Sequence, residues 1–132
     1  MFLLDTNACI RFLNGTSEAL VERVHGCRPS EITLCSIVKA ELLFGAHNSS
    51  RVEENLETLR EFFSPFVSFP FDDRAAQHYG EIRLDLSKRG NLIGPNDLLI
   101  ASIARANDVT LVTHNSAEFS RVVELKIEDW EI

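Results

Sequence analysis

The first seven residues constrain the fold more than any other stretch of the chain. Residues 2–4 continue an apolar run that starts at Met1, and Asp5-Thr6-Asn7 follow it directly. Such a run is typical of a central parallel strand that is covered on both faces. Open α/β sheets bind ligands at the carboxyl ends of their strands, so Asp5 has the position of a ligand-binding side chain. Asp is also a good helix N-cap, and this stretch alone supports both interpretations equally.

Apolar segments of strand and helix type alternate along the rest of the chain. We expect strands over residues 2–4, 31–35, 66–69, 109–113 and 122–127. We expect helices over residues 8–13, 16–25, 37–45, 49–63 and 72–89, from residue 95 onward, and after a loop at 114–119. Alternation of this kind predicts an α/β fold, a three-layer sandwich with a mainly parallel five-stranded sheet flanked by helices. No linker or repeat divides the chain, so residues 1–132 are expected to form a single domain.

Two local patterns carry further expectations about burial. The helix over 37–45 is apolar nearly all round, which predicts that it lies between the sheet and another element, and Gly45 is its expected end. Ser36 is its expected N-cap. The apolar side of the helix over 49–63 is a candidate dimer surface, although core packing explains it equally well. Trp130 is expected to anchor the C-terminal end.

Composition limits the classes of protein that this chain can belong to. With 45% hydrophobic and 25% charged residues, it is ordinary for a globular protein. No apolar run approaches the roughly 20 residues that span a bilayer, and no basic segment precedes the first apolar run, so we expect a cytoplasmic protein without membrane association. A net charge of −7 argues against a broad basic surface for nucleic acid, but not against a local basic rim or an acidic metal site.

The three cysteines do not form a recognisable framework. Cys9, Cys27 and Cys35 are odd in number and have no C-x-x-C spacing, which disulfide scaffolds and zinc sites require. We expect them to be small buried or half-buried apolar residues of a protein in a reducing compartment.

Three carboxylates have predicted positions from which they could form one shared site. Asp5 ends the first strand, Glu41 lies within the apolar helix, and Asp97 falls in the first turn of the helix opened by Gly94-Pro95. Each has a separate structural explanation; for Asp97 it is the helix dipole, worth about 0.3–1 kcal/mol. Two unit charges 4 Å apart repel by about 4 kcal/mol at an effective dielectric of 20, so such a cluster needs a shared proton or a cation. Oxygen ligands without cysteine favour Mg²⁺ or Mn²⁺.

Four segments follow one another along the chain: Leu3-Leu4-Asp5-Thr6-Asn7, Ser36-Ile37-Val38-Lys39-Ala40-Glu41-Leu42-Leu43-Phe44-Gly45, Ile93-Gly94-Pro95-Asn96-Asp97-Leu98-Leu99-Ile100-Ala101 and Leu111-Val112-Thr113-His114-Asn115. In this order they resemble the successive motifs of PIN-domain proteins, and most closely those of ribonuclease toxins of the VapC type from bacterial toxin–antitoxin pairs. The resemblance covers essentially the whole chain. It implies a PIN-like sandwich and a Mg²⁺- or Mn²⁺-dependent endoribonuclease that is homodimeric and is held inactive by a cognate antitoxin. It also implies products with a 5′-phosphate and a 3′-hydroxyl.

Carried over residue by residue, the resemblance assigns Asp5, Glu41 and Asp97 to the family's acidic metal site. Many relatives have an acid after the fourth strand, where this chain has Asn115; Glu118 follows three residues later, and both are candidates for the fourth position. An Asn adds no charge, which places a second tightly held metal ion in doubt. The neighbours Thr6 and Asn7 are expected to fix the orientation of Asp5.

The mechanism that follows is hydrolysis of an RNA phosphodiester by a metal-activated water. Asp5 and Asp97 would hold the ion, Glu41 would bind it or accept the proton of the water, and Asn115 or Glu118 would support them. Phosphate contact and a solvated basic rim are equally good interpretations of four basic residues, Arg11, Arg83, Lys88 and Arg89. His114 is either a structural loop residue or a substrate contact.

Three alternative functions can be weighed on the same residues. A haloacid-dehalogenase-like phosphatase needs a second Asp two positions after Asp5, and Asn7 stands there. A receiver-like signalling domain needs a Lys after a late strand, and none follows residues 109–113. A non-catalytic metal-binding interaction module of PIN fold stays open, because catalysis and inert binding can share these four motifs.

Overall fold

The computed structural model describes residues 1–132 and contains one five-stranded sheet with the strand order β3-β2-β1-β4-β5. All four pairs of neighbouring strands are parallel. The strands are β1 (Phe2–Leu4), β2 (Ile32–Cys35), β3 (Val67–Phe69), β4 (Thr110–Val112) and β5 (Ile127–Glu128). The predicted α/β fold with a parallel five-stranded sheet is therefore confirmed, and the first apolar run is its central strand.

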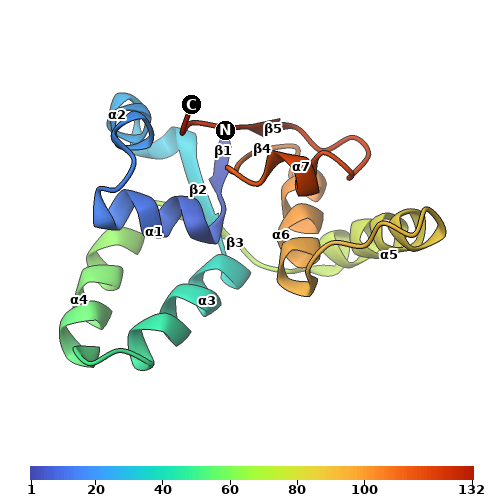
Figure 1. Ribbon diagram of the computed structural model, residues 1–132. Helices are drawn as coiled ribbons and strands as arrows, with labels where there is room; N and C mark the ends of the chain where they lie inside the picture. Colours follow the sequence, from blue (N-terminus) through green and yellow to red (C-terminus); the bar gives the residue numbers. More distant parts are fainter.

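Helices flank the sheet on both sides (Figure 1). Figure 1 shows α1, α3 and α4 together on one side of the strands, and α6 with α5 on the other. The helices are α1 (Thr6–Asn14), α2 (Glu18–Gly26), α3 (Ser36–His47), α4 (Val52–Phe63), α5 (Asp73–Lys88), α6 (Pro95–Ala106) and α7 (Ser116–Phe119), with a 3-10 turn at Pro29–Glu31.

Local sequence signals account for most helix ends. The Asp5 side chain caps α1, and the Asp72 side chain caps α5 by accepting from the backbone of Ala75 at 2.9 Å. Gly15 ends α1 with φ +66°, a left-handed conformation that glycine adopts without strain. Pro95 occupies the first turn of α6, where its missing N–H costs nothing.

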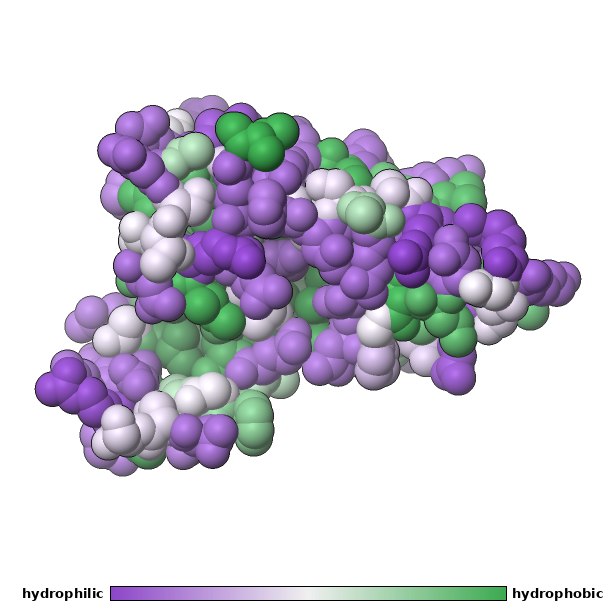
Figure 2. Space-filling model, in the orientation of Figure 1, coloured by the Kyte–Doolittle hydropathy of each residue, from purple (hydrophilic) through white to green (hydrophobic).

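Helix α3 departs from expectation in three ways. Its N-cap is Cys35, where we expected Ser36, and it continues through Gly45 to His47. Buried Leu42 and Ala46 hold its last turns against the core, which outweighs the cost of about 1 kcal/mol for a glycine inside a helix. The helix lies between β2 and α4, as expected, but its burial is incomplete, because Phe44 is 69% exposed. Figure 2 shows hydrophobic surface in the hollow where α1, α3 and α4 meet.

The last strand is shorter than predicted. Residues 122–126 are not extended, and β5 contains only Ile127–Glu128. Glu124 has φ +63°, a left-handed conformation that interrupts any extended run before it, and the Leu125 N–H donates back to the carbonyl of Val122. This turn delivers β5 to the edge of β4.

Thirty buried apolar residues form the core. Trp130 is 2% exposed and meets Phe2 edge to face, with ring centroids 4.9 Å apart, so the expected C-terminal anchor is confirmed. The apolar side of α4 packs on the same core, with Leu59 only 6% exposed, so core packing accounts for it. The cysteines are unpaired: Cys9 and Cys35 are buried and Cys27 is half-buried, as expected. No helix combines the length and the apolar character needed to cross a membrane.

Candidate active site

Asp5 sits where β1 ends and α1 begins, with its side chain only 6% exposed. Its Oδ1 accepts from the backbone N–H of Ala8 at 2.8 Å, so Asp5 is a helix cap. Burial raises the pKa of Asp5, and hydrogen bonds from the Thr113 side chain and the Ala8 backbone partly oppose that rise. The cap uses one carboxylate oxygen, so capping and ion binding are compatible interpretations of the same side chain.

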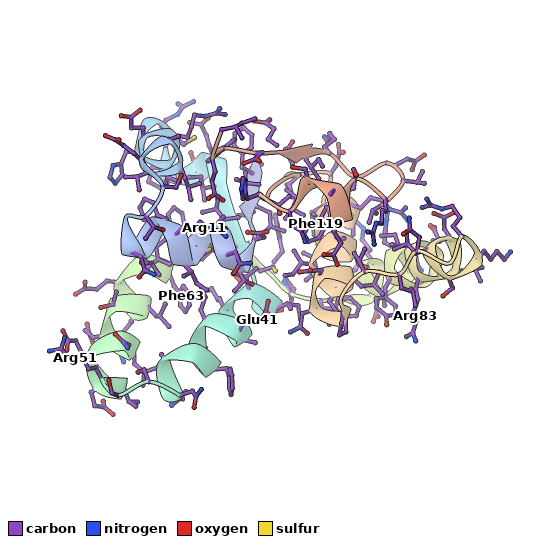
Figure 3. All side chains as sticks on the ribbon, viewed as in Figure 1. Arg11, Glu41, Arg51, Phe63, Arg83 and Phe119 are labelled. Atoms are coloured by element: carbon purple, nitrogen blue, oxygen red, sulfur yellow. The ribbon has the colours of Figure 1, made fainter.

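Glu41 is held against the first turn of α1 by Thr6. The Thr6 hydroxyl donates to Oε1 of Glu41 at 2.6 Å, which links the first turn of α1 to α3. Figure 3 shows the labelled Glu41 on α3 close to the start of α1. Thr6, which we expected to orient Asp5, therefore orients Glu41 through its side chain.

Asp97 is a half-buried residue in the first turn of α6. Burial is the largest cause that raises the pKa of its carboxyl group from 3.8 to about 6. The negative charges of Glu118, Asp5 and Glu41 raise it further, in that order. Four acids from three helices and one strand end therefore share one electrostatic field.

Glu118, from the short helix α7, is fixed on both of its oxygens. The backbone N–H of Gly94 donates to Oε1 at 2.8 Å, and the Asn115 side-chain amide donates to Oε2 at 2.5 Å. A Cβ on Gly94 would lie 3.5 Å from Oδ2 of Asp97 and 3.9 Å from Oε1 of Glu118, so this backbone runs between the two acids. Asn115 and Glu118, the two candidates for the fourth position, thus form one hydrogen-bonded unit.

Two hollows open beside these acids and share Asn7. The polar hollow has a volume of about 200 Å³ and is lined by Asp5, Asn7, Arg11, His114 and Asn115. The mixed hollow has a volume of about 560 Å³ and is lined by Thr6, Asn7, Ile10, Ile37, Ala40, Glu41, Phe44 and Asn96. Asp5 therefore borders the polar hollow and Glu41 borders the mixed one, whereas Asp97 and Glu118 line neither.

The C-terminal segment adds residues that sequence analysis missed. Asp129 is not one of the four acids above, and its Oδ2 lies 2.9 Å from Nδ1 of His114. Glu131 pairs with Arg11, with both of its oxygens 3.3 Å from guanidinium nitrogens. More than 100 residues separate Arg11 from Glu131 along the chain, so no local pattern could have revealed that pair.

One group of possible metal-binding side chains is more compact than the predicted acids. The ligand atoms of His114, Asp129 and Glu131 all lie within 4.8 Å of one another, a spacing that Asp5, Glu41 and Asp97 do not reach as a set. Each of the three already has a partner: His114 is paired with Asp129, and Glu131 is paired with Arg11. The predicted acids are the better candidates for an ion, since their like charges have few cationic partners.

Of the four basic residues proposed to contact phosphate, only Arg11 lines a hollow next to the acids. Arg83, on α5, donates a hydrogen bond to the hydroxyl of Tyr79 away from the acids, and Arg89 forms an ion pair with Asp85. Lys88 is exposed at the end of α5. Figure 3 shows Arg11 on α1 and Glu41 on α3, with Arg83 on α5 at the other end of the view.

The donor chemistry of the site fits a hard divalent cation. Carboxylates of Asp5, Glu41 and Asp97 offer only oxygen, and mutual repulsion contributes to the raised pKa of Asp97. Mg²⁺ and Mn²⁺ take such ligands and keep several waters, so a site of few carboxylates suits them.

Comparison with known proteins places the chain in a family. A model of the PIN domain matches residues 2–125. The chain is 37% identical to the tRNA(fMet)-specific endonuclease VapC of Salmonella typhimurium, over 98% of this chain and 97% of that protein. It is 37% identical to ribonuclease VapC2 of Rickettsia felis, over 99% of this chain and 98% of that protein.

Solved structures agree with this placement. The structure is similar to that of VapBC2 from Rickettsia felis bound to a DNA fragment from its promoter, with a TM-score of 0.91, 37% identity and 98% of each chain covered. DNA-bound VapBC from Salmonella typhimurium gives a TM-score of 0.92 at 37% identity, over 98% of this chain and 97% of that one. The chain therefore belongs to the PIN-domain family and, within it, to the VapC ribonucleases.

Proposed function

We propose that this chain is the toxin of a toxin–antitoxin pair, an endoribonuclease that uses Mg²⁺ or Mn²⁺ to hydrolyse RNA phosphodiester bonds in the cytoplasm. Residues 1–132 would act as a single PIN domain. The observation that carries the proposal is the half-buried position of Asp97 beside three other acids: burial first, and then the negative charges of Glu118, Asp5 and Glu41, raise its pKa to about 6. Similarity to VapC ribonucleases over nearly the full length supports it.

Each side chain of the site has a role that its contacts suit. Asp5 and Asp97 would hold the ion, which when bound lowers the pKa of water and stabilises charge on the phosphate. Glu41 has one oxygen occupied by the Thr6 hydroxyl, and its other oxygen is the group that would contact the ion or accept the proton of the attacking water. Glu118 adds negative charge beside Asp97, and Asn115 holds it there.

Cleavage of RNA by the purified chain tests this assignment. Because one relative is tRNA(fMet)-specific, initiator tRNA is the first substrate to examine. We expect cleavage with Mg²⁺ or Mn²⁺, none with EDTA, and a loss on the order of 100-fold in Asp5→Asn and Asp97→Asn, about 3 kcal/mol of transition-state stabilisation. Asp73→Asn, which changes an exposed acid at the start of α5, is the matched control.

Two results would contradict the proposal in different ways. Equal activity in the wild type and in folded Asp5→Asn and Asp97→Asn variants would refute the site. A folded wild type that binds Mn²⁺ but cleaves no RNA would favour the non-catalytic interaction module.

We further propose that a cognate antitoxin covers the apolar hollows along α1, α3 and α4. The mixed hollow and a second hollow of about 450 Å³ both include Ile10, and together they offer apolar surface beside exposed Phe44. An amphipathic helix could place its apolar face there. The solved VapBC complexes of relatives support an antitoxin partner. With the co-expressed antitoxin, Phe44→Glu should abolish co-elution; unchanged co-elution would place the antitoxin elsewhere.

We propose that the homodimer forms through α5 and the loop that follows it. Leu84 and Leu92 are 56% and 51% exposed, and Leu92 borders a hollow of about 220 Å³ that includes Tyr79 and Leu98. A two-fold axis would bring this patch against its own copy. Sedimentation should show a dimer that Leu92→Glu converts to a monomer, and a Leu92→Glu dimer would exclude this surface.

A further inference from the structure

Arg11 is the one lysine or arginine side chain that lines either hollow beside the acids. It extends from the middle of α1 into the polar hollow that Asp5 and Asn115 also line. Its side chain is 37% exposed. A phosphodiester that reaches this hollow enters a strongly acidic field, so the guanidinium is the local group with charge of the opposite sign.

Glu131 fixes the position of that guanidinium. Nε of Arg11 lies 3.3 Å from Oε1 of Glu131, and Nη1 donates to Oε2 at 3.3 Å. This two-point contact leaves Nη2, which donates to no protein acceptor. A guanidinium presents its donors in a rigid planar fork, so fixing one edge also directs the remaining donor.

The C-terminal segment makes Glu131 a rigid support. The Glu131 side chain is only 8% exposed, and its backbone N–H donates to Oδ1 of Asp129 at 2.9 Å. Next to it, Trp130 is buried against Phe2 and donates from its indole to Glu128 at 3.0 Å. Arg11 is therefore held from the C-terminal end of the chain, and this end is held by the central strand.

The charges around Arg11 indicate that it does more than hold the C-terminal end in place. Arg11 lines the same polar hollow as Asp5, and Glu131 is paired with Arg11, so both charges lie beside the acidic site. An ion pair that is partly open to solvent contributes only about 0–1 kcal/mol to stability. Arginine, by contrast, is well suited to bind phosphate through charge-assisted hydrogen bonds.

We propose that Arg11 contacts a phosphate oxygen of the bound RNA beside the metal site, and that Glu131 is the residue that positions it. The inference rests on the proposed ribonuclease function and adds a substrate contact to it. Arg11 thereby supplies positive charge that the acids, even with an ion bound, do not.

The test uses labelled initiator tRNA with the full chain. It measures binding in EDTA in the Asp97→Asn background, where no cleavage is expected, as well as cleavage with Mg²⁺ in the wild type. Arg11→Gln should raise the Kd and KM about 10-fold, since charge-assisted hydrogen bonds are the strong ones. It should also reduce the slope of log affinity against log salt by about 0.7, the value for one phosphate contact on a single strand. Arg11→Lys should restore part of the affinity and the whole salt slope.

Glu131→Gln tests the positioning role. The glutamine keeps one oxygen that can accept from Arg11 but removes the negative charge. We therefore expect KM to rise about 3-fold, with the slope of log affinity against log salt unchanged. Arg51→Gln is the matched control, because Arg51 is 72% exposed, pairs with Glu54 on the surface and lies far from Arg11 in Figure 3. Mn²⁺ affinity without RNA should be the same in Arg11→Gln and Arg51→Gln to within about 2-fold.

Failure of the inference and failure of the proposed function give different results. If the wild type cleaves RNA and Arg11→Gln changes only the melting temperature, Arg11 is a clamp for the C-terminal end and the inference is refuted. If the chain binds RNA through Arg11 but does not cleave it, the inference stands and the proposed function does not. If the wild type neither binds nor cleaves RNA, both are refuted.

Discussion

The raised pKa of Asp97 makes stability without metal depend on pH in a direction that can be measured. The carboxyl group titrates at 3.8 when unperturbed and at about 6 in the folded protein. Between these values the folded state binds more protons than the unfolded state, so the free energy of unfolding falls as pH rises from about 4 to about 6. Above pH 6, where Asp97 is ionised in the folded protein, the free energy of unfolding is lowered by the full cost of burying this charge.

The size of this penalty follows from the shift. About two pKa units correspond to roughly 3 kcal/mol, and solvent screening at this half-buried carboxyl reduces that to about 1–2 kcal/mol. Asp97→Asn removes the charge and keeps the shape. In EDTA, the variant should therefore be more stable than the wild type by about 1–2 kcal/mol at pH 7.5. At pH 4 the difference should nearly vanish.

Urea unfolding in EDTA at pH 4, 6 and 7.5 measures this difference, with Asp73→Asn as the control for an exposed acid. Because Asp5 also has a raised pKa, only the difference between wild type and Asp97→Asn isolates this group. A gap between the two proteins that is equal at all three pH values would refute the reasoning. Added Mn²⁺ should reverse the sign at pH 7.5 by stabilising the wild type alone, through preferential binding to the folded state.

Three further changes test particular contacts. Thr6→Val removes the hydroxyl that donates to Glu41, so kcat should fall about 10-fold with KM unchanged; equal rates would show that this hydrogen bond does not serve the reaction. Asn115→Asp places a second carboxylate against Glu118, so calorimetry should show tighter Mn²⁺ binding and urea titration in EDTA a lower stability. Weaker Mn²⁺ binding would place residue 115 outside the ion's reach. Trp130→Ala removes a buried indole and should cost about 3–5 kcal/mol in urea unfolding; a loss under 1 kcal/mol would mean that the C-terminal anchor is unimportant.

Local sequence was sufficient for the elements and for the candidate acids. The apolar run before Asp5 predicts a strand buried on both faces, and β1 pairs with strands on both of its sides. Pro95 marks the start of α6, and with it the position of Asp97 in the first turn. Periodicity, caps and breakers act within a few residues, so they can be read without knowing the neighbours of a segment.

Only the tertiary structure decided which side chains meet. The apolar pattern of α3 predicted a helix between the sheet and another element. It does lie between β2 and α4, but Phe44 is left exposed, because burial depends on what packs against each face of a helix. Arg11 meets Glu131 because β1 lies next to β4, and β5 adds to the far edge of β4. Strand order results from long-range packing that a local pattern does not encode. The sequence by itself therefore determined the helices, the strands and the candidate acids. The order of the strands decided that Arg11 lies beside those acids and that Glu131 holds it there.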